Sequence, residues 1–143
     1  MSENWIIPCN IKFFDLIKHF ETNKTVVWRN AFTIHEGDTA YIYIGSPYSE
    51  IRYKCRVISD QVDESLLQAN SYAIPAKKSN NYFSKKEKYI VMEYICEYPK
   101  STFTLKNLRE HGLGQVQIQA RTDRRLQAYL TDVETQLKNG GDD

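Results

Sequence analysis

The sequence lacks long apolar runs and contains little glycine, proline or cysteine. Its 143 residues include 6 Gly, 4 Pro and 3 Cys. No segment approaches the roughly 20 apolar residues that a membrane-spanning helix needs, which excludes that class of protein. The first residues carry no basic region ahead of the short apolar run at 5–7, so we expect no signal peptide and a cytoplasmic location.

Potential metal ligands are few and scattered. None of the cysteines forms a CxxC pair, and each lies in or beside an apolar, strand-like run: Cys9, Cys55 and Cys96. A zinc site needs four ligands at suitable spacing, and the three histidines, at positions 19, 35 and 111, are isolated from one another. We therefore predict buried, reduced thiols, no metal and no cofactor.

The common enzyme motifs are missing as well. The chain has no GxSxG, no P-loop, no GxGxxG and no HExxH. Neighbouring carboxylates such as Glu36 and Asp38 lie in polar turns, where solvated carboxylates are expected. Cys9 and Ser46 have no general base close to them in the sequence. The sequence therefore predicts a binding domain, not an enzyme.

The formal charge of +1 is unevenly distributed along the chain. Residues 1–51 carry a net charge of −2, residues 52–125 of +6, and residues 126–143 of −3. A basic middle region suits a face that contacts phosphates, although charged runs are most often solvated surface.

The hydrophobic pattern predicts one α+β domain over residues 1–138, followed by a flexible tail or linker at 139–143. Strand-like patterns occur at 5–9, 26–30, 39–44, 51–59 and 88–98, and helix-like patterns at 11–21, at 104–112 and from about 123 onwards. In the alternating strand, one face is predicted to carry Ile51, Tyr53, Cys55 and Val57. Because the strands are few and half-buried, we expect a strongly curved sheet or small barrel flanked by helices.

The long segment 60–87 has weak periodicity and combines cations with aromatic rings. These candidates for binding a nucleic acid are Lys77, Lys78, Lys85, Lys86, Tyr82 and Phe83. Lysines attract phosphates, and a planar ring stacks on an unpaired base at about 1–3 kcal/mol per base. The alternative is that the rings pack the loop onto the core. Core packing is the expectation for Trp5, whereas Trp28 lies in a piece too short to need so large a side chain.

The order of these elements resembles the EVE-type domains of the PUA-like superfamily, which are related to YTH domains. The resemblance is carried by the first strand with Cys9-Asn10, by Trp28, by the Gly-Asp-x-x-Tyr-Ile-Tyr pattern at 37–43 and by the Gly45-Ser46-Pro47 turn. The segment 108–113, with Gln117 or Gln119 ahead of the last helix, is similar to the end of those domains. The chain departs from the usual EVE pattern at Ala31-Phe32-Thr33, and the G-x-K-x-x-x-x-R motif of the ASCH branch is absent.

The resemblance implies a PUA-like curved sheet and an aromatic cage for a modified base. Trp28 is then one wall of the cage, with Cys9, Asn10 and Ser46 lining it, a second ring such as Tyr82, Phe83 or Tyr72, and Asn10 or Asn30 reading the base edge. Candidate phosphate contacts are Lys77, Lys78, Lys85, Lys86, Arg121, Arg124 and Arg125.

The resulting hypothesis is a reader that flips and holds a methylated or otherwise modified DNA base. It acts as the targeting module of a restriction nuclease or ATPase on the same or a neighbouring chain. An RNA-binding PUA-like domain is the main alternative. Enzymes on nucleosides and protein-binding modules are further ones.

Overall fold

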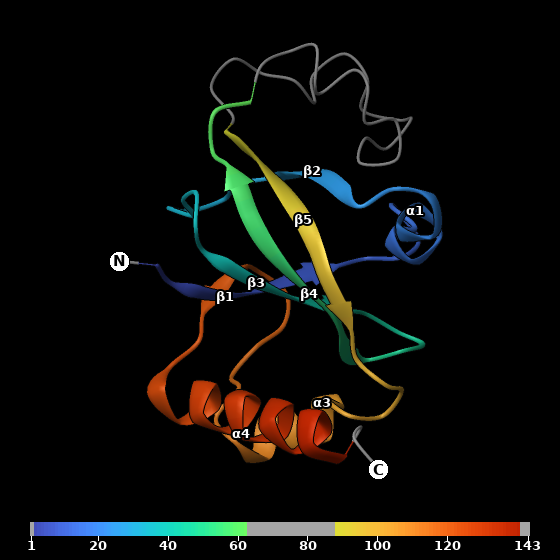
Figure 1. Cartoon of the computed structure of the whole chain (residues 1–143), viewed down its shortest axis with the longest axis vertical. Coiled ribbons are helices and arrows are strands. Elements are labelled where there is room, and N and C mark those ends of the chain that lie inside the picture. Colours follow the sequence, from blue (N-terminus) through green and yellow to red (C-terminus); the bar gives the residue numbers. More distant parts are fainter. Residues whose placement is uncertain (1, 63–87, 141–143) are drawn as a thin grey trace.

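The computed structural model describes residues 2–62 and 88–140, and these form a six-stranded mixed sheet with helices on both faces (Figure 1). In chain order the elements are β1 (Asn4–Cys9), α1 (Leu16–Thr22), β2 (Thr25–Arg29), β3 (Thr39–Ile44), β4 (Glu50–Ser59), β5 (Tyr89–Glu97), α3 (Leu105–Glu110), β6 (Ala120–Arg121) and α4 (Arg124–Gly140). The strand order is β2-β5-β4-β3-β1-β6. The predicted α+β class with a curved sheet is confirmed.

All neighbouring strands are antiparallel except β1 and β3, which run parallel. The chain makes this pairing by crossing from β1 through α1 and β2 before it returns as β3. Because parallel strands end at the same edge of a sheet, Cys9 at the end of β1 lies opposite Ile44 at the end of β3. The loops that follow these two strands therefore start side by side.

Alternation along the strands divides the core between two faces of the sheet. On the α1 face, Leu16 and Phe20 of α1 pack with strand residues such as Ile7 and Ile42. On the α4 face, residues of α3 and α4 pack with Ile6 and Tyr41. Figure 1 shows α3 and α4 together below the sheet, with α1 beside β2 and β5.

The strand β4 does not keep one face along its whole length. A register shift between Ile42 and Tyr43 of β3 makes Tyr53 the partner of Ile42 and Ile51 the partner of Tyr43. Ile51 therefore packs on the α4 face, while Tyr53, Cys55 and Val57 pack on the α1 face. The prediction that all four share a face was wrong for Ile51, because a β-bulge interrupts the period of two.

Helix boundaries follow their caps. The helix predicted at 11–21 begins only at Leu16, because Asp15 caps it by accepting from Lys18 N–H at 3.0 Å. In α3, Thr104 caps the start, and Gly112 follows its end with a φ of 108°, which favours glycine. The helix α4 starts after Asp123, whose carboxylate accepts from Leu126 N–H at 2.7 Å.

The helix α4 also continues through Gly140, so residues 139 and 140 are helical, although the sequence suggested a flexible tail there. The two-residue strand β6 was not predicted, because it is too short to show any periodicity.

Candidate functional site

The candidate site begins where β1 and β3 end next to each other. Gly45 N–H donates to the carbonyl oxygen of Cys9 at 3.1 Å, which joins the turn after β3 to the end of β1. In the next residue after Cys9, the Asn10 carbonyl accepts from the N–H groups of Phe13 and Phe14 at 3.0 and 3.1 Å. Ser46 and Asn10 are both exposed at this edge. The structure thus brings Cys9, Asn10 and Ser46 into one region.

Trp28 joins this region through Phe14. The two rings are 5.3 Å apart at an interplanar angle of 61°, an edge-to-face contact. Phe14 is buried, and its carbonyl oxygen lies 3.5 Å from the Sγ atom of Cys9. Trp28 itself is only partly buried, on the edge strand β2. Its indole therefore keeps some accessible surface beside Phe14, in the loop that follows β1.

The thiol of Cys9 is not prepared for nucleophilic chemistry. Burial raises its pKa to about 12, so that the thiolate is a minor species near neutral pH. Burial raises the pKa of Cys55 to about 12 as well. All three cysteines are free of disulfides, Cys9 and Cys55 being buried and Cys96 partly buried. Within the described part of the chain, no group of three or more His, Cys, Asp or Glu side chains is placed to hold a metal ion.

Asn30 is committed to the loop that follows β2. Its Nδ2 donates to the carbonyl oxygen of Ile34 at 2.9 Å, and its Oδ1 accepts from Ile34 N–H at 3.1 Å. Both ends of the amide thus bond the backbone four residues later and close the loop. To read a base edge, Asn30 has to share or exchange these bonds.

Gln119 holds this region together, although the sequence pattern indicated it only as one of two glutamines ahead of the last helix. It is buried, its Nε2 donates to Arg29 O at 2.7 Å, and its Oε1 accepts from Ala31 N–H at 3.0 Å. These two bonds bracket Asn30. They also connect the segment before β6, at one edge of the sheet, to the end of β2 at the other edge. Gln117, by contrast, is exposed.

Asp38 fixes the other end of the same loop. Its carboxylate is buried and accepts from the Trp5 Nε1–H, from His35 N–H and from Glu3 N–H, each at 2.9 Å. Trp5 is 3% exposed, as expected for a core residue. The Gly37-Asp38 pair of the recognised pattern therefore has a structural reason, because Gly37 turns the chain at a φ of 94° and Asp38 satisfies three donors.

Of the candidate phosphate contacts, the three arginines lie in the described part of the chain and the four lysines do not. Arg121 is exposed on β6, with its guanidinium 5.3 Å from the centre of the Trp5 ring. Arg124 and Arg125 are exposed in the first turn of α4, and Arg125 also donates to the carbonyl oxygen of Glu110 at 2.7 Å. The other candidates lie outside the described residues: Lys77, Lys78, Lys85, Lys86, Tyr72, Tyr82 and Phe83.

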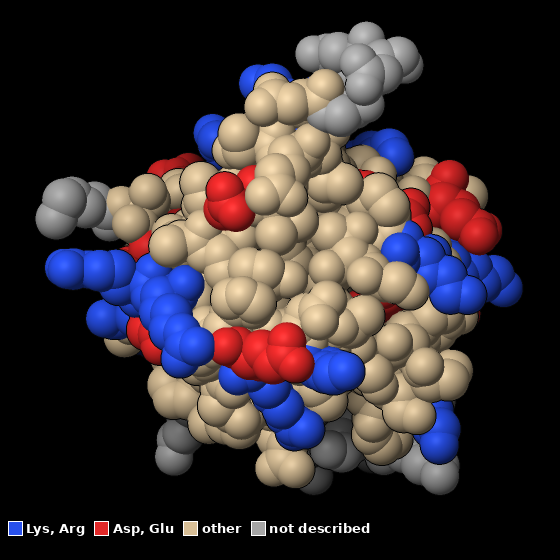
Figure 2. Space-filling view, turned by 90° about the horizontal axis from the view of Figure 1, so that it is seen from below, with Lys and Arg blue, Asp and Glu red and all other residues tan. Residues whose placement is uncertain are grey.

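The face formed by α3 and α4 carries no single basic patch. Figure 2 shows lysine and arginine side chains toward its margins, most densely on the side where α4 begins, with acidic side chains between them and uncharged surface at the centre. This pattern makes the α4 face a poor track for a polyanion.

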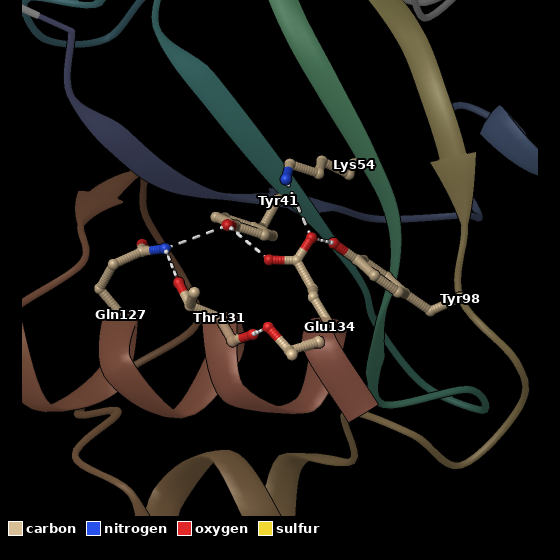
Figure 3. A network of polar contacts seen from close by, with 7 residues as sticks. Tyr41, Lys54, Tyr98, Gln127, Thr131 and Glu134 are labelled. Atoms are coloured by element: carbon tan, nitrogen blue, oxygen red, sulfur yellow. Dashed lines mark hydrogen bonds and ion pairs between the residues drawn. The ribbon is translucent and has the colours of Figure 1, made fainter. Parts of the chain in front are cut away.

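A polar network holds α4 on the sheet, and the sequence did not predict it (Figure 3). The Glu134 carboxylate accepts from Tyr98 OH at 2.8 Å, from Lys54 Nζ at 2.9 Å and from Tyr41 OH at 3.3 Å. Gln127 donates to Tyr41 OH at 3.1 Å. The partners Lys54 and Glu134 are 80 residues apart in the sequence, so no local pattern reveals the pair.

The network also sets the protonation of its members. Burial, the hydrogen bond to Glu134 and its negative charge raise the pKa of Tyr98. Burial raises the pKa of Tyr41, which the hydrogen bond from Gln127 partly offsets. Burial by itself lowers the pKa of Lys54, but the bond to Glu134 and nearby charges outweigh it, so that the pKa is raised. The Lys54 ammonium lies 2.9 Å from the Glu134 carboxylate and forms an ion pair with it.

Among the helices in the described residues, none is long and apolar enough to cross a membrane. No family model and no curated protein matches the chain.

Solved structures do match it. A mutant ASCH protein from Zymomonas mobilis is 14% identical, with a TM-score of 0.67 over 92% of this chain and 96% of its own. A hypothetical protein from Leishmania major is 17% identical, with a TM-score of 0.61 over 96% and 98%. A protein from Pseudomonas syringae is 14% identical, with a TM-score of 0.62 over 91% and 98%.

The chain has the PUA-like fold. At these identities the similarity concerns the fold of the PUA-like domain and not its branch. Similarity to an ASCH structure therefore does not assign this chain to the ASCH branch, whose G-x-K-x-x-x-x-R motif the sequence lacks. The resemblance to EVE domains depends only on the residues named for it above.

Proposed function

We propose that this PUA-like domain is a nucleic-acid reader that holds a flipped base against the indole of Trp28. The observation that carries the proposal is that Trp28 is only partly buried and packs edge-to-face with Phe14, in the loop after β1. Trp5, by contrast, is almost fully buried. A partly exposed indole whose orientation is held by a ring contact is suited to stacking on a planar ligand.

The energetics fit a flipped base better than a weak surface contact. Extruding a base from a duplex costs a few kcal/mol. Stacking on one or two rings returns about 1–3 kcal/mol for each, and hydrogen bonds to the base edge add to this. A methyl group buried against an aromatic face contributes about 0.8 kcal/mol more, which favours a modified base over its unmodified form.

The finer assignment is a modified DNA base, with methylated DNA first. The domain then acts as the targeting module of a restriction nuclease or ATPase on the same or a neighbouring chain. Support comes from the EVE and YTH resemblance. The proposal assigns no catalytic step and no cofactor to this chain, and it places the protein in the cytoplasm. The raised pKa of Cys9 is consistent with a binding role, because the thiol at the candidate site stays protonated.

The test is a binding panel with matched variants of Trp28. Fluorescent DNA strands and duplexes that differ in one base would carry the unmodified base, 5-methylcytosine, 5-hydroxymethylcytosine or N6-methyladenine. Selective binding should be strong in the wild type, partly retained in Trp28→Phe, and reduced about 5- to 100-fold in Trp28→Leu, which keeps apolar volume without a ring. Urea unfolding of each variant controls for loss of the fold.

Three results would change the assignment. Weak, equal binding to every probe that Trp28→Leu leaves unchanged would reject the reader of modified bases. Binding to structured RNA, lost in Trp28→Leu while DNA is ignored, would replace DNA with RNA. Affinity that does not fall with rising salt would count against any nucleic-acid backbone as ligand.

A further inference from the structure

Phe32 is a large aromatic side chain that the core does not need. It is 47% exposed in the loop after β2, and its ring stacks on Trp5 with the ring centres 6.5 Å apart and the planes 15° from parallel. This stacking holds the orientation of Phe32 while nearly half of its surface stays accessible. Ala31-Phe32-Thr33 is also the segment where the sequence departs from the usual EVE pattern.

An arginine is fixed beside the same indole. The guanidinium of Arg121 lies 5.3 Å from the centre of the Trp5 ring, and its Nη2 donates to the Oγ1 of Thr33 at 3.3 Å. Arg121 is exposed, and among residues 2–62 and 88–140 no carboxylate forms an ion pair with it. Its position is therefore held by Thr33 and the Trp5 ring, and no described carboxylate neutralises its charge.

The loop that carries Phe32 is rigidly tied. Asn30 bonds Ile34 at both ends of its amide, and Gln119 bonds Ala31 N–H. The ring of Phe32, in the loop after β2, and the guanidinium of Arg121, on β6, thus lie against the same buried indole of Trp5. Because both side chains are already held, they lose little conformational freedom when a ligand binds. Preorganisation of this kind strengthens binding without new contacts.

The separation between Trp28 and Phe32 determines which ligands can contact both side chains at once. Four residues of extended chain span at most about 14 Å, so the Cα atom of Phe32 lies within that distance of the Cα atom of Trp28. Consecutive nucleotides of one strand are about 3.4 Å apart in a duplex. A strand with one base at Trp28 therefore needs only a few nucleotides to span the distance to Phe32.

We infer that Phe32 and Arg121 form a second nucleotide subsite, in which Phe32 stacks on a base that flanks the flipped one and Arg121 binds its phosphate. This inference rests on the proposed function and deepens it, because it makes the ligand a polynucleotide strand and not a free nucleoside or a single base. The subsite contributes affinity that does not depend on the modification.

The test removes the ring and the flanking base separately and together. Fluorescence anisotropy would measure binding of a single-stranded DNA oligonucleotide that carries the preferred base of the panel, and of versions with one abasic position scanned along its flanks. We expect Phe32→Ala to weaken binding to the intact strand about 5- to 100-fold. One abasic position should weaken wild-type binding similarly and have no further effect in Phe32→Ala.

Matched variants keep the result specific. Phe32→Tyr retains a stacking ring and should bind like the wild type, and Ile95→Ala removes another exposed apolar side chain far along β5. Arg121→Gln should lower the slope of log affinity against log salt by about one, whereas the slope change of Arg56→Gln, on the exposed side of β4, should be smaller.

Failure of this inference differs from failure of the proposed function. If Trp28→Leu abolishes selectivity while Phe32→Ala binds every strand like the wild type, the subsite is rejected and the reader stands. If Phe32→Ala weakens the intact and all abasic strands equally, the ring does not stack on a flanking base, and the subsite is again rejected. If wild-type protein binds no strand at low salt, the proposed function fails and the subsite with it.

Discussion

Several polar side chains on the two faces of the sheet bond different kinds of partner. On the α1 face and its edges, Asp38, Asn30 and Gln119 bond mainly backbone groups of loops. On the α4 face, the carboxylate of Glu134 bonds the side chains of Tyr98, Lys54 and Tyr41. Hydrogen bonds to backbone groups hold a loop in one conformation. Hydrogen bonds between side chains hold the helix α4 against the sheet.

This difference separates the site from its support. The bonds of Asn30, Gln119 and Asp38 fix the loop between β2 and β3, which carries Phe32, so the order of this loop bears on the proposed ligand binding. The network on the α4 face has its polar groups satisfied by one another and lies behind a face without a single basic patch. Substitutions in the Glu134 network should therefore lower the free energy of unfolding and leave ligand affinity unchanged. Substitutions of the residues that hold the loop after β2 should mainly lower ligand affinity.

The largest expected effect is a loss of stability at alkaline pH. Cys9 and Cys55, on the α1 face, have their pKa raised from 9.0 to about 12 by burial. The native state keeps these protons where the unfolded chain releases them, so the stabilisation is complete below about pH 9 and is lost as the pH rises toward about 12. One pKa unit corresponds to about 1.4 kcal/mol, and the loss should reach several kcal/mol, measured by urea unfolding across this window.

Cysteine variants test whether the buried thiols of the α1 face cause this loss of stability at alkaline pH. A Cys9→Ala/Cys55→Ala double variant should show a clearly shallower decline than Cys96→Ala, because Cys96 lies on the α4 side and is only partly buried. An equal decline in both variants would mean that the thiols of the α1 face are not its source. Tyrosines with raised pKa values, which lie on both faces, would then be responsible: Tyr41 and Tyr98 on the α4 face, and Tyr53 and Tyr94 on the α1 face.

The next effect in size is the removal of the network's centre. Glu134→Ala leaves the Lys54 ammonium and the hydroxyls of Tyr98 and Tyr41 without their shared acceptor. We expect a loss of about 2–3 kcal/mol in the free energy of unfolding, since the pair is mostly shielded from solvent. Urea unfolding measures the loss, and affinity for the preferred strand should change little.

A conservative variant tests whether charge or hydrogen bonding dominates. Glu134→Gln keeps an acceptor for the tyrosines but removes the charge that faces Lys54, so it should lose less stability than Glu134→Ala. A large fall in ligand affinity in either variant, with the fold intact at the temperature of the assay, would contradict the division between the faces.

Local patterns predicted the parts of the fold that depend on neighbouring residues. The patterns at 39–44 and 51–59 predicted β3 and β4, and the end of α3 near Gly112 and the start of α4 near Thr122 or Asp123 were predicted because caps act within a few residues. The helix at 11–21 was predicted too long for a related reason. Phe13 fits the helical spacing, but Asn10 and Asp15 form a turn and a cap that start the helix later, which leaves Phe13 68% exposed.

Contacts between distant parts of the chain were beyond local patterns. Gln119 and Ala31 are 88 residues apart, and nothing in the spacing of either residue names the other. The same holds for Glu134 and Lys54, which are 80 residues apart. Trp28 was singled out because its size exceeded the needs of a short strand, but its contact with Phe14 needed the three-dimensional arrangement.

The smallest and most local effect is expected at Gln119. In Gln119→Ala, Ala31 N–H loses its acceptor and Arg29 O its donor, while the rest of the core is unchanged. We expect a loss of about 2 kcal/mol in global stability, because the two lost hydrogen bonds are each worth about 1 kcal/mol net. Hydrogen exchange at the Ala31 amide should nevertheless become much faster, and affinity for the strand should fall because the loop that carries Phe32 is released.

Two further variants separate the bonds of Gln119. Gln119→Glu keeps an acceptor for Ala31 N–H but has no donor for Arg29 O, so protection of the Ala31 amide should survive while the link to β2 is weakened. Gln117→Ala, at an exposed position two residues earlier, should alter neither. If the Ala31 amide stays protected in Gln119→Ala, the loop is held by its own Asn30–Ile34 bonds. The bridge between the two edges of the sheet would then not be what orders the binding side.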